Sequence, residues 1–133
     1  MSKKKLSNLT SVAQESALSN KRVRNDPNYI LSQKLRIKVR RALRENSNKL
    51  LKQFGYTVEE LRTHLESNFT ENMSWENYGE WHIDHKEPCA KFNLQCLGQQ
   101  RKCFHYSNLQ PLWKRENILK GSVFEGKRHY YGK

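Results

Sequence analysis

The amino-acid sequence predicts an α+β fold, with basic helices over residues 28–70 and a unit of two strands and a helix over about residues 78–122. Three observations predict it. Apolar residues recur with helical spacing after Asp26. A helix-capping pattern begins at Thr57. Two short strand-like runs, separated by a long connection, then lead into a last helical segment.

The first helix is predicted from its apolar stripe. Asp26-Pro27 suits a helix start, because proline fits the first helical turn. Apolar residues then recur at i, i+4, i+8, i+11 and i+12, at Leu31, Leu35, Val39, Ala42 and Leu43. The other faces carry six positive charges before the next carboxylate, at Lys34, Arg36, Lys38, Arg40, Arg41 and Arg44. Because ordinary surface helices mix both signs, this run favours a helix that follows a phosphate backbone over a merely solvated face.

Two shorter helices are expected next. Residues 47–54 form the first, which Gly55 closes, and Thr57 opens the second through a T-x-x-E capping box. His64 lies near the apolar stripe of this second helix, and we interpret it as a partly buried histidine without chemistry. Three aromatic residues follow without helical period. They fit core packing around the site or, for one of them, stacking on a base: Trp75, Tyr78 and Trp81.

The polar residues of most interest lie in the remaining elements. The run W-H-I-D-H, residues 81–85, is predicted to be a strand, in which successive side chains point to opposite faces. A bend or bulge after Asp84 would let Asp84 and His85 reach one site. A long loop follows, then Asn108 at the start of a second strand, and then a short helix that contains Asn117 and ends at glycine.

Charge and composition indicate nucleic acid as the partner. The 133 residues include 25 Lys and Arg against 13 Asp and Glu, a net charge of +12, and the sequence pI is about 9.8. No apolar run approaches the ~18 residues that span a bilayer. The basic N-terminus lacks the apolar segment of a secretory signal. Three cysteines without such a signal favour reduced thiols in a cytoplasm, that of a host cell if a phage encodes the chain.

The charge is distributed unevenly along the chain. Residues 1–25 predict a mobile basic arm. The net charge is +9 over residues 21–52 and −6 over residues 53–88, and the acidic segment contains eight carboxylates, among them Asp84. Carboxylates that face a phosphate backbone repel it unless a divalent cation lies between them. An acidic segment inside a basic chain therefore points to a bound cation.

These residues carry a resemblance to a known family. The runs W-H-I-D-H, C-F-H-Y-S-N-L-Q-P-L-W and R-E-N-I-L-K-G resemble the HNH endonuclease family, most of all its small single-domain members from bacteriophage genomes. The resemblance extends over about residues 26–121. It implies the ββα-metal (His-Me finger) fold, a hairpin and a helix around one divalent ion, in a single nuclease domain over residues 26–133. It also implies a metal-dependent DNA endonuclease, with nicking or weakly specific duplex cleavage.

The roles of the family transfer to five residues. The resemblance makes Asp84 a metal ligand, His85 the general base that activates water, and Asn108 the residue that fixes the loop and orients the base. Asn117 stands where the last histidine of the motif would be, which makes the chain an H-N-N variant with Asn117 as second ligand. His82 either contacts the scissile phosphate, helps to position the metal or only hydrogen-bonds within the hairpin. Two oxygen ligands favour Mg²⁺ or Mn²⁺ over Zn²⁺.

The cysteines do not have the spacing of known zinc ribbons or knuckles. Cys89, Cys96 and Cys103 stand seven apart and His105 follows, so a Cys₃His site is conceivable, but a structural zinc ion is not expected. In a strand, Cys103 and His105 would share a face. Small buried apolar residues are the simpler interpretation of the three thiols.

DNA is the expected partner, and six basic residues are predicted to contact it: Arg36, Arg40, Arg44, Lys38, Lys114 and Lys120. The main alternative is a non-catalytic basic nucleic-acid-binding module built on residues 31–44, which has no use for Asp84, His85 and Asn117 together. A structural zinc-binding interaction domain is a second alternative. One HNH site cuts one strand, so the chain is a monomer if it nicks. The target sequence, the oligomeric state and the biological role are left open by the sequence.

Overall fold

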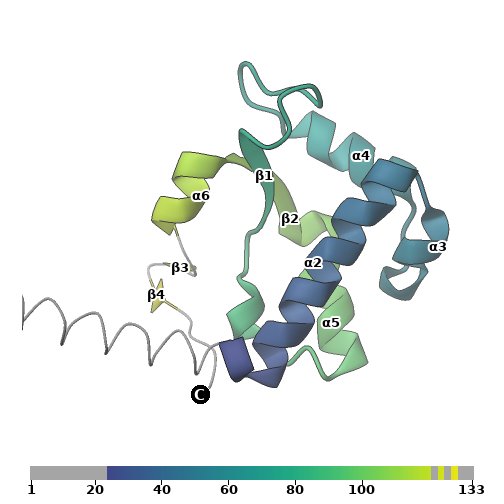
Figure 1. Cartoon of the computed structure of the whole chain (residues 1–133), viewed down its shortest axis with the longest axis vertical. Coiled ribbons are helices and arrows are strands. Elements are labelled where there is room, and N and C mark those ends of the chain that lie inside the picture. Colours follow the sequence, from purple (N-terminus) through teal and green to yellow (C-terminus); the bar gives the residue numbers. More distant parts are fainter. Residues whose placement is uncertain (1–23, 121–122, 125–126, 129–133) are drawn as a thin grey trace, which may run out of the picture.

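The computed structural model describes residues 24–120, 123–124 and 127–128 (Figure 1). The predicted arm over residues 1–25 lies almost wholly outside them. The described residues form helices and small antiparallel sheets of two strands, so the predicted α+β class is confirmed. One sheet pairs β1 with β2, and the other pairs the short strands β3 (Val123–Phe124) and β4 (Lys127–Arg128), which the sequence did not predict.

The helix α2 (Pro27–Glu45), the longest of the described residues, confirms the predicted first helix. Asp26 caps it, because its Oδ1 accepts hydrogen bonds from the backbone N–H of Asn28 at 2.8 Å and of Tyr29 at 3.3 Å. Four residues of the stripe side are buried: Ser32, Leu35, Val39 and Ala42. The arginines remain on the outer faces, where the side chain of Arg44 is 75% exposed.

Two shorter helical segments follow α2, as predicted. Helix α3 (Asn48–Leu51) continues into the 3₁₀ helix η1 (Lys52–Phe54), and Gly55 ends it with a φ of +80°. Helix α4 (Val58–Ser67) begins with the predicted capping box. The Thr57 hydroxyl accepts from the Glu60 N–H at 3.1 Å, and the Glu60 carboxylate accepts from the Thr57 N–H at 3.2 Å.

The central sheet pairs β1 (Trp81–His85) with β2 (Leu109–Trp113). The antiparallel register runs without interruption from Trp81↔Trp113 to His85↔Leu109. The bulge considered after Asp84 is therefore absent from this ladder. Helix α6 (Lys114–Lys120) follows β2 directly and packs against both strands. The predicted order of strand, strand and helix is thus confirmed.

The predicted long loop between the two strands contains short helical segments. They are the 3₁₀ helix η2 (Cys89–Lys91), the helix α5 (Leu97–Phe104) and the 3₁₀ helix η3 (Tyr106–Asn108). The sequence did not predict α5, because its residues L-G-Q-Q-R-K-C-F show almost no apolar periodicity. Its buried apolar residues, Cys103 and Phe104, both lie at its end. Cys103 is therefore helical, and the idea that it shares a strand face with His105 is wrong.

The hydrophobic core joins these elements and fixes where the hairpin lies. Its most deeply buried residues include Leu51, Leu61, Leu65, Phe104 and Leu109, each at most 1% exposed. A cluster of aromatic rings encloses the other end of the hairpin, with Trp81 fully buried and its ring centroid 4.8–5.3 Å from three neighbours: Tyr78, Phe69 and Trp75. Trp81 thus packs in the core as predicted, whereas Trp75 is half-buried and Tyr78 is exposed.

In Figure 1 the helices α2 and α6 lie on either side of β1, and the loop between α4 and β1 projects above them. Among the helices of the described residues, none combines the length and the apolar character that crossing a bilayer needs.

Candidate functional site

The predicted site residues meet at a cavity bounded by α2, β1 and α6. Asp84 and His85 line it from the end of β1, and Asn117 lines it from α6. Its volume is about 290 Å³, and α2 contributes Arg36 to its wall. A neighbouring cavity of about 110 Å³ shares three of these residues and adds His82. The fold therefore brings together residues that are far apart in the sequence.

Asp84 is the buried acid of this cavity. Its side chain is 8% exposed, and its Oδ2 accepts hydrogen bonds from Gln110 Nε2 at 2.8 Å and from Lys120 Nζ at 2.6 Å. The Lys120 ammonium also donates to the backbone carbonyl of His85 at 2.6 Å. Lys120, which was predicted to contact DNA, is thus an ion-pair partner inside the site.

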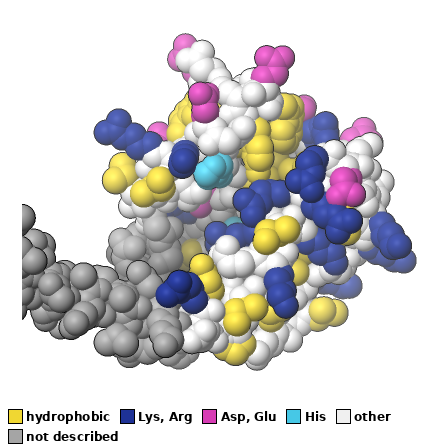
Figure 2. Space-filling view, in the orientation of Figure 1, with side chains coloured by type: hydrophobic (Ala, Val, Ile, Leu, Met, Phe, Trp, Pro, Cys, Tyr) yellow, Lys and Arg dark blue, Asp and Glu magenta, His cyan; other side chains and the backbone are white. Residues whose placement is uncertain are grey.

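The acidic segment as a whole does not gather at the cavity. Of the carboxylates over residues 53–88, Asp84 alone is buried. Figure 2 shows acidic side chains at the top of the molecule, over the loop between α4 and β1. Of the acidic residues that were expected to lie beside a cation, only Asp84 lines this cavity.

His85 is held in a buried setting at the end of β1. It is 5% exposed, and its ring meets that of Phe104 edge to face with the centroids 4.6 Å apart. Its Nε2 is buried without a hydrogen-bond partner among the described residues. The side chain lines both cavities, so it lies close to any molecule that enters them.

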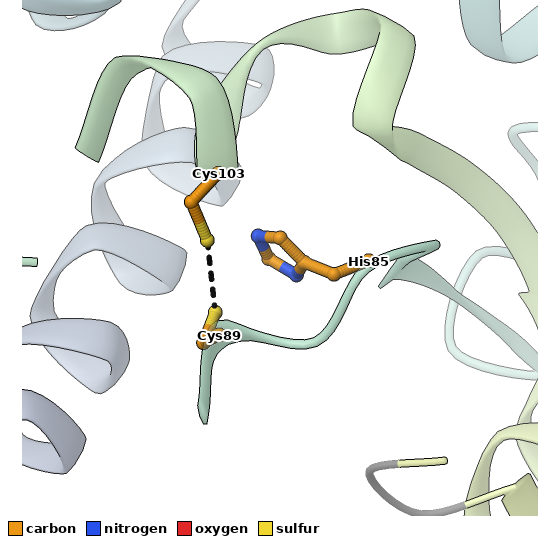
Figure 3. Close-up of side chains that lie close together, drawn as sticks. All are labelled: His85, Cys89 and Cys103. Atoms are coloured by element: carbon orange, nitrogen blue, oxygen red, sulfur yellow. Dashed lines mark hydrogen bonds between the residues drawn. The ribbon is translucent and has the colours of Figure 1, made fainter. Parts of the chain in front are cut away.

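Two buried cysteines lie beside His85, as Figure 3 shows. The ligand atoms of His85, Cys89 and Cys103 all lie within 4.8 Å of one another, so this cluster could hold a metal ion. Thiolate and imidazole ligands are typical of zinc rather than magnesium. The interpretation of these two thiols as mere packing residues is therefore incomplete.

The sequence did not predict a zinc ion, and the one set of ligands that it suggested is a different one. It grouped all three cysteines with His105, but Cys96 is exposed and His105 Nδ1 lies 2.7 Å from the Ser107 hydroxyl. Helix α5 brings Cys103 to Cys89 and the end of β1 instead. In the sequence, the spacing His85-x₃-Cys89 was the signal for two of these three residues. The third residue, Cys103 on α5, could be recognised only from the folded structure.

The two buried thiols share one hydrogen bond. Cys103 Sγ donates to Cys89 Sγ at 3.5 Å, which lowers the pKa of Cys89 well below its ordinary value and raises the pKa of Cys103. Burial opposes the lowering at Cys89. His85 and Arg36 assist it, and Arg36 Nη2 lies 3.5 Å from the Cys89 sulfur. The environment thus favours a negative charge on Cys89.

Asn108 ties the two ends of the connection together. Its Oδ1 accepts from the Glu87 N–H at 2.9 Å, and its Nδ2 donates to the carbonyls of Glu87 at 3.1 Å and of Cys103 at 2.8 Å. Its own carbonyl accepts from the Lys86 N–H at 2.8 Å. These bonds hold the backbone that follows His85, so Asn108 fixes this loop; its orienting of a base stays a prediction.

The predicted DNA-contacting arginines lie along one exposed side of α2. Arg36 and Arg40 line the smaller cavity, and Arg40 and Arg44 line a groove of about 620 Å³ that includes Trp75 and Tyr78. Figure 2 shows Lys and Arg side chains gathered over α2, and a histidine side chain is visible at the surface in the same view. Basic side chains therefore extend from the site along the helix.

The remaining predicted contacts differ in setting. Lys38 is half-buried, and its ammonium donates a hydrogen bond to the side-chain carbonyl of Gln53. Lys114 is exposed at the start of α6, and His82 is half-buried on the wall of the smaller cavity. His64 matches its interpretation, because its Nε2 lies 2.8 Å from the Leu109 carbonyl in a half-buried position.

Comparison with known proteins gives relatives whose names state no activity. No family model matches the chain, and no solved structure matches it. An uncharacterized protein of Acanthamoeba polyphaga mimivirus is 39% identical over 99 residues, which cover 73% of this chain and 44% of the relative. A second uncharacterized protein of the same virus is 32% identical over 120 residues, 88% of this chain and 53% of the relative. The chain spans about half the length of these curated relatives.

Proposed function

We propose that the protein is a metal-dependent DNA endonuclease of the HNH type, built on the ββα-metal fold, in which His85 is the general base. One observation carries the proposal: Asp84, His85 and Asn117 line a single cavity whose wall also contains Arg36. A carboxylate, an imidazole, an amide and a guanidinium in one cavity supply the groups that phosphodiester hydrolysis needs: a metal ligand, a base and a cation for the phosphate.

The residues fit a hard divalent cation. Asp84 and Asn117 offer a carboxylate and an amide oxygen, the donors that Mg²⁺ and Mn²⁺ prefer. The Lys120 ammonium pairs with Asp84 Oδ2 at 2.6 Å, so an ion would have to displace it from this oxygen or bind the other one. When bound, such an ion stabilises negative charge on the phosphate and on the leaving oxygen.

In this proposal His85 takes the proton from the attacking water. An imidazole is the side chain most often used as a general base at neutral pH. The Phe104 ring restricts the imidazole, Lys120 holds the backbone carbonyl of His85, and Asn108 fixes the residues that follow. Nε2 has no hydrogen-bond partner among the described residues but is shielded from solvent, so the base role requires that water reach the ring.

The arginines of α2 supply a path for the phosphate backbone. Arg36 and Arg40 lie at the wall of the site, and Arg44 extends the path away from it. Beside this path, Tyr78 is 38% exposed and Trp75 lies under the guanidinium of Arg62, 5.4 Å from the ring centroid. Aromatic faces next to arginines suit nucleic acid. One such site cuts one strand, so we expect nicking.

A non-catalytic nucleic-acid-binding module is the second candidate. The ion pair between Lys120 and Asp84 favours it, because a carboxylate that is already neutralised needs no further cation. This candidate and the nuclease predict the same binding surface on α2. They differ only in whether the phosphodiester bond is cleaved.

The test is incubation of the full chain with supercoiled plasmid and Mg²⁺ or Mn²⁺, with EDTA as control. We expect nicked circles from the unaltered protein and none after Asp84→Asn, while gel-shift binding persists. Glu76→Gln removes an equal charge from the exposed loop before β1 and should cleave normally. Binding without cleavage in either metal would support the module, and full activity of Asp84→Asn would refute the metal-ligand role.

A further inference from the structure

We propose that His85, Cys89 and Cys103 form a binding site for one zinc ion, separate from the oxygen ligands Asp84 and Asn117. The site does not depend on nuclease activity. It combines three segments of the chain: the end of β1, the 3₁₀ helix η2 and the last turn of α5 (Figure 3). The three ligand residues are 5%, 1% and 0% exposed, respectively.

The geometry is close to that of a zinc site. A tetrahedral ion with Zn–S bonds of about 2.3 Å holds its two sulfurs about 3.8 Å apart. The sulfurs of Cys89 and Cys103 are 3.5 Å apart, and the ligand atom of His85 completes a set within 4.8 Å. The two sulfurs therefore need to separate by only a few tenths of an ångström, whereas the histidine nitrogen, which lies within 4.8 Å of them, has to come to about 3.6 Å from each sulfur to complete the set.

A missing hydrogen bond in the cluster also points to a bound ion. A buried polar nitrogen ordinarily has a hydrogen-bond partner, whereas Nε2 of His85 has none among the described residues. The Cys89 sulfur accepts a hydrogen bond from the Cys103 thiol at 3.5 Å and lies 3.5 Å from Arg36 Nη2, so both of its neighbours present a positive end to it. Zinc would take both sulfurs as thiolates and release protons on binding.

A four-coordinate zinc ion at this cluster would have three protein ligands and one open position. His85 and Cys89 both line the cavity of about 290 Å³, so this cavity provides access for the ion and room for a further ligand such as water. Two sulfurs and an imidazole select zinc over Mg²⁺, which prefers oxygen. The cavity would thus have a sulfur-containing wall for zinc and an oxygen-containing wall for a hard cation.

The experiment uses Co²⁺ as the spectroscopic probe on the reduced full chain, without DNA. We expect one Co²⁺ per chain, a thiolate-to-cobalt charge-transfer band, and loss of that band when zinc is added. Loss of a residue that merely supports a ligand costs about 10–100-fold in metal affinity. Cys89→Ser and Cys103→Ser, which each remove a ligand, should therefore cost at least about 100-fold.

Cys96→Ser is the matched control, because this cysteine is exposed and outside the cluster. It should retain the unaltered affinity and band. Zinc should also raise the Tm of the unaltered chain and of Cys96→Ser, but not that of Cys89→Ser, provided each is folded by circular dichroism. No charge-transfer band in the unaltered chain, or equal loss in all three serine variants, would overturn the proposal. Because no DNA is present, failure of the zinc site here is distinct from failure of cleavage in the plasmid assay.

Discussion

At the scale of single residues, the site depends on how buried charges are balanced. The Asp84 carboxylate is neutralised by Lys120, and the same ammonium binds the carbonyl of His85. A buried carboxylate without a partner is strongly disfavoured, so the ion pair with Lys120 compensates the burial of Asp84. A divalent cation would compete with Lys120 for this carboxylate.

The first residue-scale prediction concerns the proposed base. His85→Ala should reduce cleavage by about 10²–10⁴-fold, the usual contribution of a general base. DNA binding should persist, because a neutral imidazole adds little to affinity. His105→Ala removes a half-buried histidine that lies outside both cavities and should cleave normally. Single-turnover cleavage measures the effect, and a wild-type rate for His85→Ala would exclude the base role.

The second concerns the oxygen ligands. Asp84→Ala and Asn117→Ala should each weaken Mn²⁺ binding in calorimetry, Asp84→Ala more strongly because it removes the charge. Excess metal should partly restore cleavage by Asn117→Ala. Asn108→Ala should lower the cleavage rate with nearly unchanged metal affinity, since Asn108 bonds the backbone and not the cavity. Unchanged metal affinity in both ligand variants would contradict the assignment.

At the scale of elements, α2 presents arginines at i, i+4 and i+8 along one side. Replacing Arg36, Arg40 and Arg44 together by Gln should make the slope of log K against log salt shallower by about two to three, because each phosphate contact contributes about 0.9. Affinity should fall alike on two unrelated duplexes, since phosphate contacts carry no base information. Titrations at several salt concentrations measure both effects.

A triple variant with the same change of charge serves as the control for α2. Lys49, Lys52 and Lys102 are exposed on α3, η1 and α5, away from the two site cavities. Their replacement by Gln should alter the slope much less. Equal effects of the two triple variants would mean that net charge, and not the α2 surface, determines binding.

A second element-scale prediction concerns Tyr56, which joins η1 and α5. Its hydroxyl donates to the Phe104 carbonyl at 2.6 Å, and burial raises its pKa above the ordinary value. Above about pH 10 the unfolded tyrosine ionises while the folded one keeps its proton, so stability falls as pH rises. Tyr56→Phe should cost about 1 kcal/mol at neutral pH.

The loss of stability at alkaline pH tests the Tyr56 prediction. Urea unfolding at about pH 8 and at about pH 11 gives the change in the free energy of unfolding for each protein. Tyr56→Phe should lose less stability between these two pH values than the unaltered chain does. An equal loss in both would show that the alkaline sensitivity arises from other groups.

At the scale of the whole molecule, one histidine has two proposed roles, because His85 is both the general base of the endonuclease and a ligand of the zinc site. If the zinc site and the endonuclease are both correct, zinc takes a lone pair of His85 that the base requires. Added zinc should then inhibit Mg²⁺-dependent nicking by the unaltered chain and by Cys96→Ser, and much less by Cys89→Ser. Plasmid nicking across a zinc titration measures this. Equal inhibition of all three proteins would place the inhibitory zinc at Asp84 instead.

Much of the fold could be predicted because the relevant signals are local. The apolar stripe of α2, the capping box at Thr57 and the glycine after η1 each depend on residues within a few positions. The strand W-H-I-D-H and the helix after β2 also followed from short runs. Helix α5 was missed because burial of Cys103 and Phe104, and not its own periodicity, stabilises it.

The sequence by itself determined the α+β class, the order of the hairpin and helix, and the candidate residues Asp84, His85 and Asn117. Only the tertiary structure decided which side chains meet. Core packing brings Asn117 and Arg36 to the cavity, seats Lys120 on Asp84, and brings Cys103 beside His85 in place of Cys96. The physical reason is range. Helix caps and strand alternation are set by neighbouring residues, whereas contacts between distant segments depend on how the whole core packs.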